Sequence, residues 1–252
     1  MTHRFPSVKT IAWLTSAQMV EVDRAMIEDF HIELMQMMEN AGRALARVAR
    51  ERFLGGNPGG KQVIVLAGPG GNGGGALACA RRLSNWGAHV SVFLAAPASD
   101  FTPVPAHQLD ILGRIGIEVN DAGALASSAT AALVVDGVIG YSLRGAPRGA
   151  AATLIEWANA QPVPILALDV PSGVDATIGA VHRPAIRAAA TLTLALPKEG
   201  LRNPEAARHV GELYLADIGV PPELYARMTP PVAVGPIFAR DDVVHVLASA
   251  SA

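Results

Sequence analysis

A glycine-rich segment follows the first strongly apolar run of the chain, and its residue types suit the binding of an anion. It reads Gly68-Pro69-Gly70-Gly71-Asn72-Gly73-Gly74-Gly75, follows the apolar residues 63–67 and precedes a helix-like segment at 77–86. A strand that ends in such a turn and continues into a helix presents backbone N–H groups at the positive helix N-terminus, which favours phosphate or another anion. Six glycines in eight residues also lose much conformational entropy on folding, so a simple connection explains them poorly.

The same segment contains the pattern G-x-G-x-x-G, formed by Gly68, Gly70 and Gly73. In a dinucleotide-binding fold, an acidic residue at the end of the next strand would hold a ribose hydroxyl. The next predicted strand, 89–94, continues into Ala-Ala-Pro, and the first acidic residue after it is Asp100. The sequence therefore disfavours an ordinary nicotinamide-dependent dehydrogenase.

Two aspartates stand where further apolar runs end. Asp136 follows the run 131–135, and Asp169 follows the run 164–168. Either aspartate alone could simply cap a following helix. Near-continuous apolar strands indicate a parallel sheet covered on both faces, and ligands bind such sheets at the carboxyl ends of the strands. Together with the glycine-rich segment, the two aspartates therefore predict a site in one crevice.

The pattern as a whole predicts an α/β fold: a doubly wound, mostly parallel, Rossmann-like sheet with helices on both faces. The chain has 252 residues, which suits a single domain over 1–252 with a full core. The strands at 62–67, 131–136 and 164–169 should lie side by side, and the first two should flank the point where strand order reverses.

The remaining predicted elements complete this sheet. Two leading helices should run from Thr15 or Ser16 to about Phe30 and from Leu34 to Phe53. The further strands are expected at 89–94, 117–119, 190–195 and 211–216, and the further helices at 73–86, 105–115, 122–129, 149–160 and 243–247.

Four blocks of sequence resemble a known family. They are Thr15-Ser16-Ala17-Gln18-Met19 with Asp23 and Met38-Glu39-Asn40-Ala41-Gly42, the glycine-rich segment, Asp136 to Gly145, and Asp169-Val170-Pro171-Ser172-Gly173-Val174-Asp175 with Gly179. On these blocks, which span roughly residues 13 to 225, the chain is identified as a member of the YjeF amino-terminal domain family. Its characterised enzymes are NAD(P)H-hydrate epimerases, and the resemblance also implies a homodimer.

The resemblance implies a set of site residues. The substrate would be bound by Gly71, Asn72, Gly73, Gly74, Gly75, Gly140, Tyr141, Ser142, Leu143, Arg144, Gly145, Ala146 and Asp169. A potassium ion would be held by Asn72, Asp136 and Ser172, whose hard oxygen atoms suit such a cation. Asp169 would be the catalytic carboxylate.

The chain departs from the family at two chemically important positions. The family's glycine loop commonly reads Asn-Asn-Gly-Gly-Asp-Gly, and here Gly71 replaces the first asparagine and Gly75 replaces the aspartate. These two glycines would remove side chains from the pocket. A third motif that commonly carries Gly-x-Gly is Gly140-Tyr141-Ser142 in this chain.

The implied reaction is epimerisation at C6 of hydrated NADH or NADPH. The ring nitrogen would help to expel the C6 hydroxyl, and water would return from either face of a planar intermediate. Such a reaction needs acid/base groups at the hydroxyl. Without the loop aspartate, the resemblance leaves Asp169 as the carboxylate for this role and supplies no second one. Two alternatives stay open: a different lyase or isomerase acting on a small apolar or nucleotide-like ligand, and a non-catalytic binding protein.

Composition narrows the possible partners and location. The net charge is −2 with no basic cluster, so nucleic acid is an unlikely partner. The apolar runs are too short for a membrane span, and the start of the chain lacks a signal-peptide core. The single cysteine, Cys79, should be packed in the core, and a cytoplasmic location follows. Lys198 and Arg144 could each reach a phosphate or simply be solvated.

Overall fold

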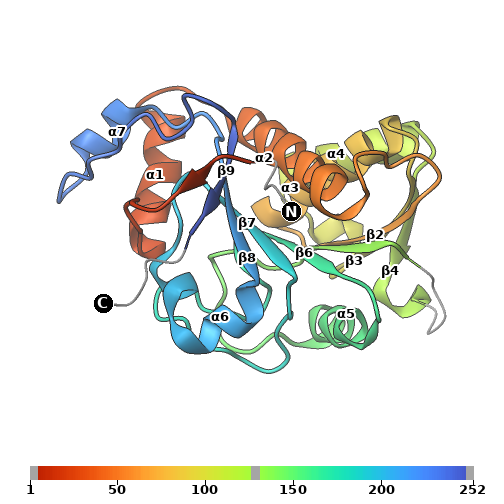
Figure 1. Cartoon of the computed structure of the whole chain (residues 1–252). Coiled ribbons are helices and arrows are strands. Elements are labelled where there is room, and N and C mark those ends of the chain that lie inside the picture. The colour runs from red at the N-terminus through yellow and green to blue at the C-terminus, as the bar shows by residue number, and fades with distance from the viewer. Residues whose placement is uncertain (1–4, 126–130, 248–252) are drawn as a thin grey trace.

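One mixed sheet forms the centre of the protein. The computed structural model describes residues 5–125 and 131–247, and within them nine strands follow the order β1-β9-β8-β7-β6-β5-β2-β3-β4 (Figure 1). The strands are β1 Ser7–Val8, β2 Gln62–Ala67, β3 His89–Leu94, β4 Glu118–Asp121, β5 Leu133–Gly137, β6 Ile165–Leu168, β7 Ala190–Leu194, β8 Glu212–Ala216 and β9 Val243–Val246. Neighbouring strands from β4 to β8 pair in parallel, which confirms the predicted fold class.

Strand order reverses between β2 and β5, as predicted. From β2 the chain continues outward through β3 and β4, whereas β5, β6, β7 and β8 lie on the other side. The register pairs Leu66 of β2 with Asp136 of β5, and Asp136 with Ala167 of β6. The three strands therefore end together, and their following loops meet at one edge of the sheet.

Helices cover both faces of the sheet. Figure 1 shows α2, α3 and α4 on one face and α5 and α6 on the other. The helices are α1 Ser16–Glu28, α2 Leu34–Val48, α3 Gly71–Asn85, α4 Pro103–Arg114, α5 Gly149–Ala160, α6 Pro204–Val210 and α7 Pro222–Arg227. A short π-helix at Ala49–Phe53 extends α2. Short 3-10 helices lie at Ala98–Asp100, Ala122–Ala124 and Glu199–Arg202. None of the described helices combines the length and the apolar character that a membrane span requires.

Small residues let α2 and α3 approach closely over the sheet. A Cβ atom added at Gly42 of α2 would lie 2.5 Å from the Cβ of Ala78 in α3. Cys79 of α3 is fully buried in the same core, as predicted, and burial raises the pKa of its thiol. This contact holds α2 against α3, so that α2 also reaches the loops at the strand ends.

The helix α1 packs against the segments that follow β7 and β8. Its start is fixed by a capping box, in which Thr15 Oγ1 accepts a hydrogen bond from the Gln18 N–H (3.2 Å) and Gln18 Oε1 accepts one from the Thr15 N–H (2.9 Å). Its apolar stripe, which includes Met19 and Met26, packs with Ile218 and with α7.

The prediction of a helix at 243–247 is wrong, because this segment forms strand β9. It pairs antiparallel with β8 and parallel with β1. Val243, Val244 and Val246 are branched at Cβ and favour an extended chain when pairing partners are present. The helix expected at 122–129 is a 3-10 turn at Ala122–Ala124, and residues 126–129 lie outside the described residues. The strand β1 and the short helices α6 and α7 were not predicted.

A close approach between two loops gives a stability prediction. A Cβ added at Gly68 would lie 1.9 Å from the Val138 carbonyl oxygen, whereas one added at Gly113 of α4 would meet nothing within 4 Å. We expect Gly68→Ala to lower the free energy of unfolding by about 1–3 kcal/mol, the usual cost of overpacking. The control Gly113→Ala should leave it unchanged or raise it, since Ala favours a helix over Gly. Urea denaturation measures both, and a Gly68→Ala protein as stable as wild type would contradict the close approach.

Candidate active site

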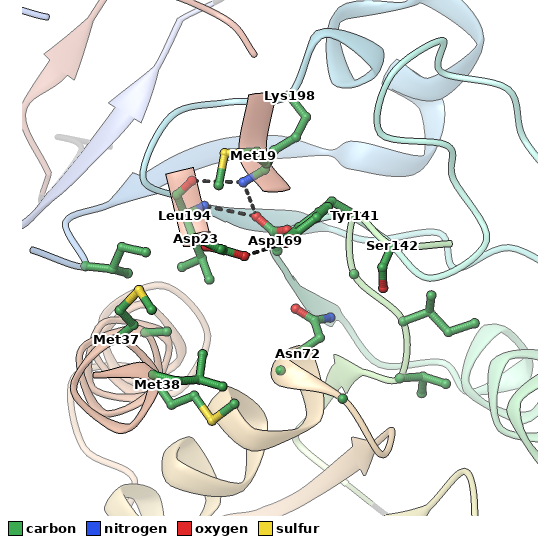
Figure 2. Close-up of a pocket in the computed structure, with 18 of the residues that line it drawn as sticks. Met19, Asp23, Met37, Met38, Asn72, Tyr141, Ser142, Asp169, Leu194 and Lys198 are labelled. Atoms are coloured by element: carbon green, nitrogen blue, oxygen red, sulfur yellow. Dashed lines mark hydrogen bonds and ion pairs between the residues drawn. The ribbon is translucent and has the colours of Figure 1, made fainter. Parts of the chain in front are cut away.

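The loops after β2, β5, β6 and β7 enclose a cavity at the carboxyl ends of the strands, with α1 and α2 forming its other walls. Its volume is about 490 Å³, and Figure 2 shows its lining. The lining residues are Met19, Asp23, Leu34, Met37, Met38, Ala41, Pro69, Gly70, Gly71, Asn72, Val138, Ile139, Gly140, Tyr141, Ser142, Asp169, Leu194, Lys198 and Ile218. A mostly apolar wall with a few converging polar groups is typical of a small-molecule site.

Asp169 stands directly after β6 in a left-handed backbone conformation, with a φ of 64°. Asp and Asn adopt this conformation far more readily than most residues with a side chain. Its N–H donates to the Leu192 carbonyl oxygen at 2.7 Å, which keeps it tied to β7. The sequence prediction that Asp169 faces the strand-end crevice agrees with its place in the cavity wall.

Asp169 and Lys198 form an ion pair inside the protein. The Lys198 side chain is fully buried, and Lys198 Nζ donates to Asp169 Oδ1 and to the Leu194 carbonyl oxygen, the latter at 2.9 Å. A second hydrogen bond to Oδ1 comes from the Leu194 N–H at 3.2 Å. The alternative that Lys198 is a solvated surface lysine is therefore wrong. Its ammonium group instead balances the charge of Asp169.

The segment before α1 holds Lys198 in place. Leu14 forms a β-bridge with Lys198, its N–H donates to the Pro197 carbonyl oxygen, and its own carbonyl oxygen accepts from the Glu199 N–H, both at 2.9 Å. The same short segment therefore positions the lysine and starts the helix that closes the cavity.

A second polar pair in the cavity joins Asp23 of α1 to Tyr141 of the loop after β5. The Tyr141 hydroxyl donates to Asp23 Oδ2 (Figure 2). Burial raises the pKa of Asp23, and the hydrogen bond from Tyr141 opposes part of that rise. Burial also raises the pKa of Tyr141, so its phenol stays protonated at neutral pH.

Sequence reasoning gave Asp23 no role in the site. The available signal was its position four residues after Met19 and three before Met26, on the apolar stripe of α1. An acidic residue on the buried face of a helix needs a partner or a function.

Only part of the glycine-rich segment lines the cavity. Gly71 and Asn72 do, and Asn72 Nδ2 donates to the Leu168 carbonyl oxygen at 3.0 Å. Gly73, Gly74 and Gly75 are buried against other groups: a Cβ added at each would lie 1.8 Å from the Gly68 carbonyl oxygen, 2.4 Å from Met38 Sδ and 2.7 Å from Leu168 Cδ2, respectively. The expectation that Gly75 leaves space in the pocket is therefore wrong, whereas Gly71 faces the cavity.

The loop after β5 also lines the cavity with only part of its predicted site residues. Gly140, Tyr141 and Ser142 line the cavity, whereas Leu143, Arg144, Gly145 and Ala146 are not among its lining residues. Arg144 and Arg148 are exposed on this loop.

Asp136 and Ser172 meet behind the cavity wall. Ser172 Oγ donates to Asp136 Oδ1 at 2.6 Å, and the Ser172 N–H donates to Asp136 Oδ2 at 2.9 Å. The Ile139 N–H of the cavity wall donates to Ser172 Oγ at 2.8 Å. Both side chains are fully buried, and burial raises the pKa of Asp136 to about 6.

The donor set at this point fits a monovalent cation. No cationic side chain in the described part of the chain forms an ion pair with Asp136, and a buried carboxylate is normally paired or bound to a metal. Asn72 lies at the same strand ends. Its Nδ2 donates to the Leu168 carbonyl oxygen, and a Cβ added at Gly140 would lie 3.2 Å from Asn72 Oδ1. An amide oxygen, a carboxylate and a hydroxyl are hard ligands of the kind such an ion prefers.

Known proteins resemble this chain in sequence and in fold. Residues 34–200 match the family model described as YjeF-related protein N-terminus. The chain belongs to this family. It is 43% identical over 220 residues to the NAD(P)H-hydrate epimerase of Dehalogenimonas lykanthroporepellens, covering 87% of this chain and 86% of that protein.

A longer relative and a solved structure are also similar. The bifunctional NAD(P)H-hydrate repair enzyme Nnr of Salinibacter ruber is 35% identical, and the match covers 83% of this chain but 41% of that enzyme. The crystal structure of yeast ynu0 superimposes with a TM-score of 0.77 at 25% identity, covering 93% of this chain and all of the yeast chain.

The buried ion pair gives a second stability prediction. Lys198→Met would leave the Asp169 carboxylate buried without its partner, and we expect a loss of about 3–5 kcal/mol in the free energy of unfolding. The double variant Lys198→Met/Asp169→Asn should recover part of this loss, because Asn tolerates the left-handed backbone and carries no charge. Urea denaturation of the single and double variants tests this. A double variant no more stable than Lys198→Met would contradict the ion-pair account.

Proposed function

We propose that this protein interconverts the two C6 epimers of hydrated NADH and NADPH. The observation that carries the proposal is the cavity in which Asp169 and Lys198 stand beside the glycine-rich turn, in a chain 43% identical to an enzyme named for this activity. The N-terminus of α3 offers backbone N–H groups for a phosphate. The apolar side chains of Met37, Met38 and Leu34 suit the face of a ring.

The reaction requires only proton transfers and a reversible loss of water. As the C6–O bond breaks, the oxygen takes the electron pair and a proton and leaves as water, while the N1 lone pair forms a C6–N1 double bond. Water then attacks the other face of C6, the double-bond pair returns to N1, and one proton leaves the new hydroxyl. Nothing is oxidised or reduced, and a positioned acid or base typically contributes 10²–10⁴-fold to such a step.

Asp169 is the carboxylate that we assign to proton transfer at the C6 hydroxyl. It lines the cavity, and Lys198, Leu194 and the left-handed backbone fix its orientation. The buried Lys198 ammonium would balance the negative charge of the Asp169 carboxylate and keep it oriented.

A potassium ion completes the proposed site. Asn72, Asp136 and Ser172 would hold it, and its charge would neutralise the buried Asp136 carboxylate. When bound, the ion would supply only its charge. The residues that would hold it lie at the ends of β5 and β6 and at the N-terminus of α3, so binding would tie together the segments that carry the cavity wall. The homodimer and the cytoplasmic location stay predictions from the sequence.

Cation binding can be tested without the substrate. A cation that binds only the folded protein raises the melting temperature, so KCl should raise it by several degrees more than choline chloride at the same ionic strength. Asp136→Asn should abolish this difference. Glu156→Gln, at an exposed position on α5, should keep it. An equal response of wild type to both salts would contradict the cation site.

The activity is tested with the separated R and S hydrates of NADH. Chromatography should show wild-type protein converting either isomer into the equilibrium mixture faster than the spontaneous reaction. Asp169→Asn should slow this conversion by about 10²–10⁴-fold. The control Asp110→Asn, on the exposed side of α4, should match wild type.

The source of the new hydroxyl provides a further check on the route. In heavy-oxygen water the epimerised product should carry the heavy atom at C6, since the hydroxyl leaves as water and returns from solvent. A wild-type rate equal to the spontaneous one would contradict the proposed function and favour a diverged enzyme or a binding protein.

A further inference from the structure

Epimerisation through a planar intermediate uses two proton transfers, one to the departing oxygen and one from the incoming water. In this chain Gly75 stands where the family commonly carries a loop aspartate. Gly75 is not among the residues that line the cavity, and a Cβ added there would lie 2.7 Å from Leu168 Cδ2. The glycine-rich segment therefore supplies no second carboxylate. A second proton-transferring group, if present, has to come from another element.

Asp23 of α1 is a carboxylate in the cavity wall with one oxygen available. Oδ2 accepts the hydrogen bond of the Tyr141 hydroxyl, and no described residue donates to Oδ1. Asp23 and Asp169 both line this cavity (Figure 2), and the charge of Asp169 acts on Asp23. The charged or titratable groups that act on Asp23 are Tyr141, Lys198, Asp169 and Tyr225.

The two carboxylates have different surroundings. Asp169 is tied to the buried Lys198 ammonium, which balances its negative charge. Asp23 has no ion pair among the described residues and bonds only to the neutral phenol of Tyr141. Burial raises the pKa of Asp23, which suits a group that must carry a proton. Two titratable groups with opposed environments are the usual basis for dividing acid and base roles.

On the basis of the proposed function, we propose that Asp23 is a second catalytic carboxylate, which exchanges a proton with the C6 oxygen, and that Tyr141 positions it. Protonated Asp23 gives its proton to the departing hydroxyl, which leaves as water. Asp169 takes the proton from the water that attacks C6. A turnover thus moves one proton from Asp23 to Asp169, and exchange with solvent resets the two. The reverse reaction uses them in the opposite order.

The test is the epimerisation rate of Asp23→Asn on the separated hydrates. Asparagine keeps the size and the hydrogen bond with Tyr141 but cannot exchange the proton. We expect kcat to fall by about 10²–10⁴-fold with KM changed much less. The control Glu28→Gln changes an exposed acid of the same helix and should retain the wild-type rate. Asp23→Ala provides a second variant, and added formate should restore part of its rate.

Tyr141→Phe tests the positioning role through pH. The hydroxyl hydrogen bond lowers the pKa of Asp23, so removing it should keep Asp23 protonated to higher pH. The alkaline limb of the kcat profile should therefore move up by roughly 0.5–1 pH unit, the effect of about one hydrogen bond. A purely structural role for Tyr141 would lower the rate without moving this limb.

The outcomes separate this inference from the proposed function. An active wild type with an equally active Asp23→Asn overturns the inference alone. A wild type no faster than the spontaneous reaction overturns the proposed function and the role of Asp23 with it. A loss of rate in Asp23→Asn that comes with a melting temperature as low as that of Lys198→Met, and with no formate rescue of Asp23→Ala, also overturns the catalytic role.

Discussion

The buried ion pair between Asp169 and Lys198 is the interaction on which the arrangement of the cavity depends. It joins the end of β6 to the segment after β7, and that segment is bridged to Leu14 directly before α1. Because a buried charge is tolerated only when it is paired, these three segments must keep one relative position. The helix that carries Asp23 is thereby held over the strand ends, where the Tyr141 hydroxyl reaches it.

The glycines of the strand-end turn serve mainly the packing around this cavity. Gly68 and Gly73 allow backbone to pass against backbone, and Gly74 and Gly75 admit the side chains of Met38 and Leu168. The turn can then bring the N-terminus of α3 to the edge of the cavity. Its Asn72 is held by the carbonyl of Leu168 at the end of β6, so packing and site geometry depend on the same few contacts.

The sequence was sufficient to predict the elements that depend on local residue patterns. Apolar runs at 62–67, 131–136 and 164–169 predicted neighbouring strands, and their ends predicted that Asp136 and Asp169 stand at one edge of the sheet. The sequence was insufficient to predict features that depend on a contact with a segment far away along the chain. The valines of β9 form a strand because β8 and β1 flank them. Lys198 follows β7 and is buried because it pairs with Asp169, which follows the neighbouring strand β6. Asp23 enters the cavity because contacts distant in sequence, among them the bridge between Leu14 and Lys198, place α1 at the strand ends.

The central claim is that the strand-end cavity receives the reacting ring between these polar groups. The most direct measurement is a crystal structure of the Asp169→Asn protein with hydrated NADH bound. The account predicts the C6 oxygen within hydrogen-bond distance, about 2.6–3.2 Å, of Asp23 or of residue 169, with the phosphates at the N-terminus of α3. A nucleotide bound elsewhere, or bound here with C6 pointing away from both side chains, would contradict it.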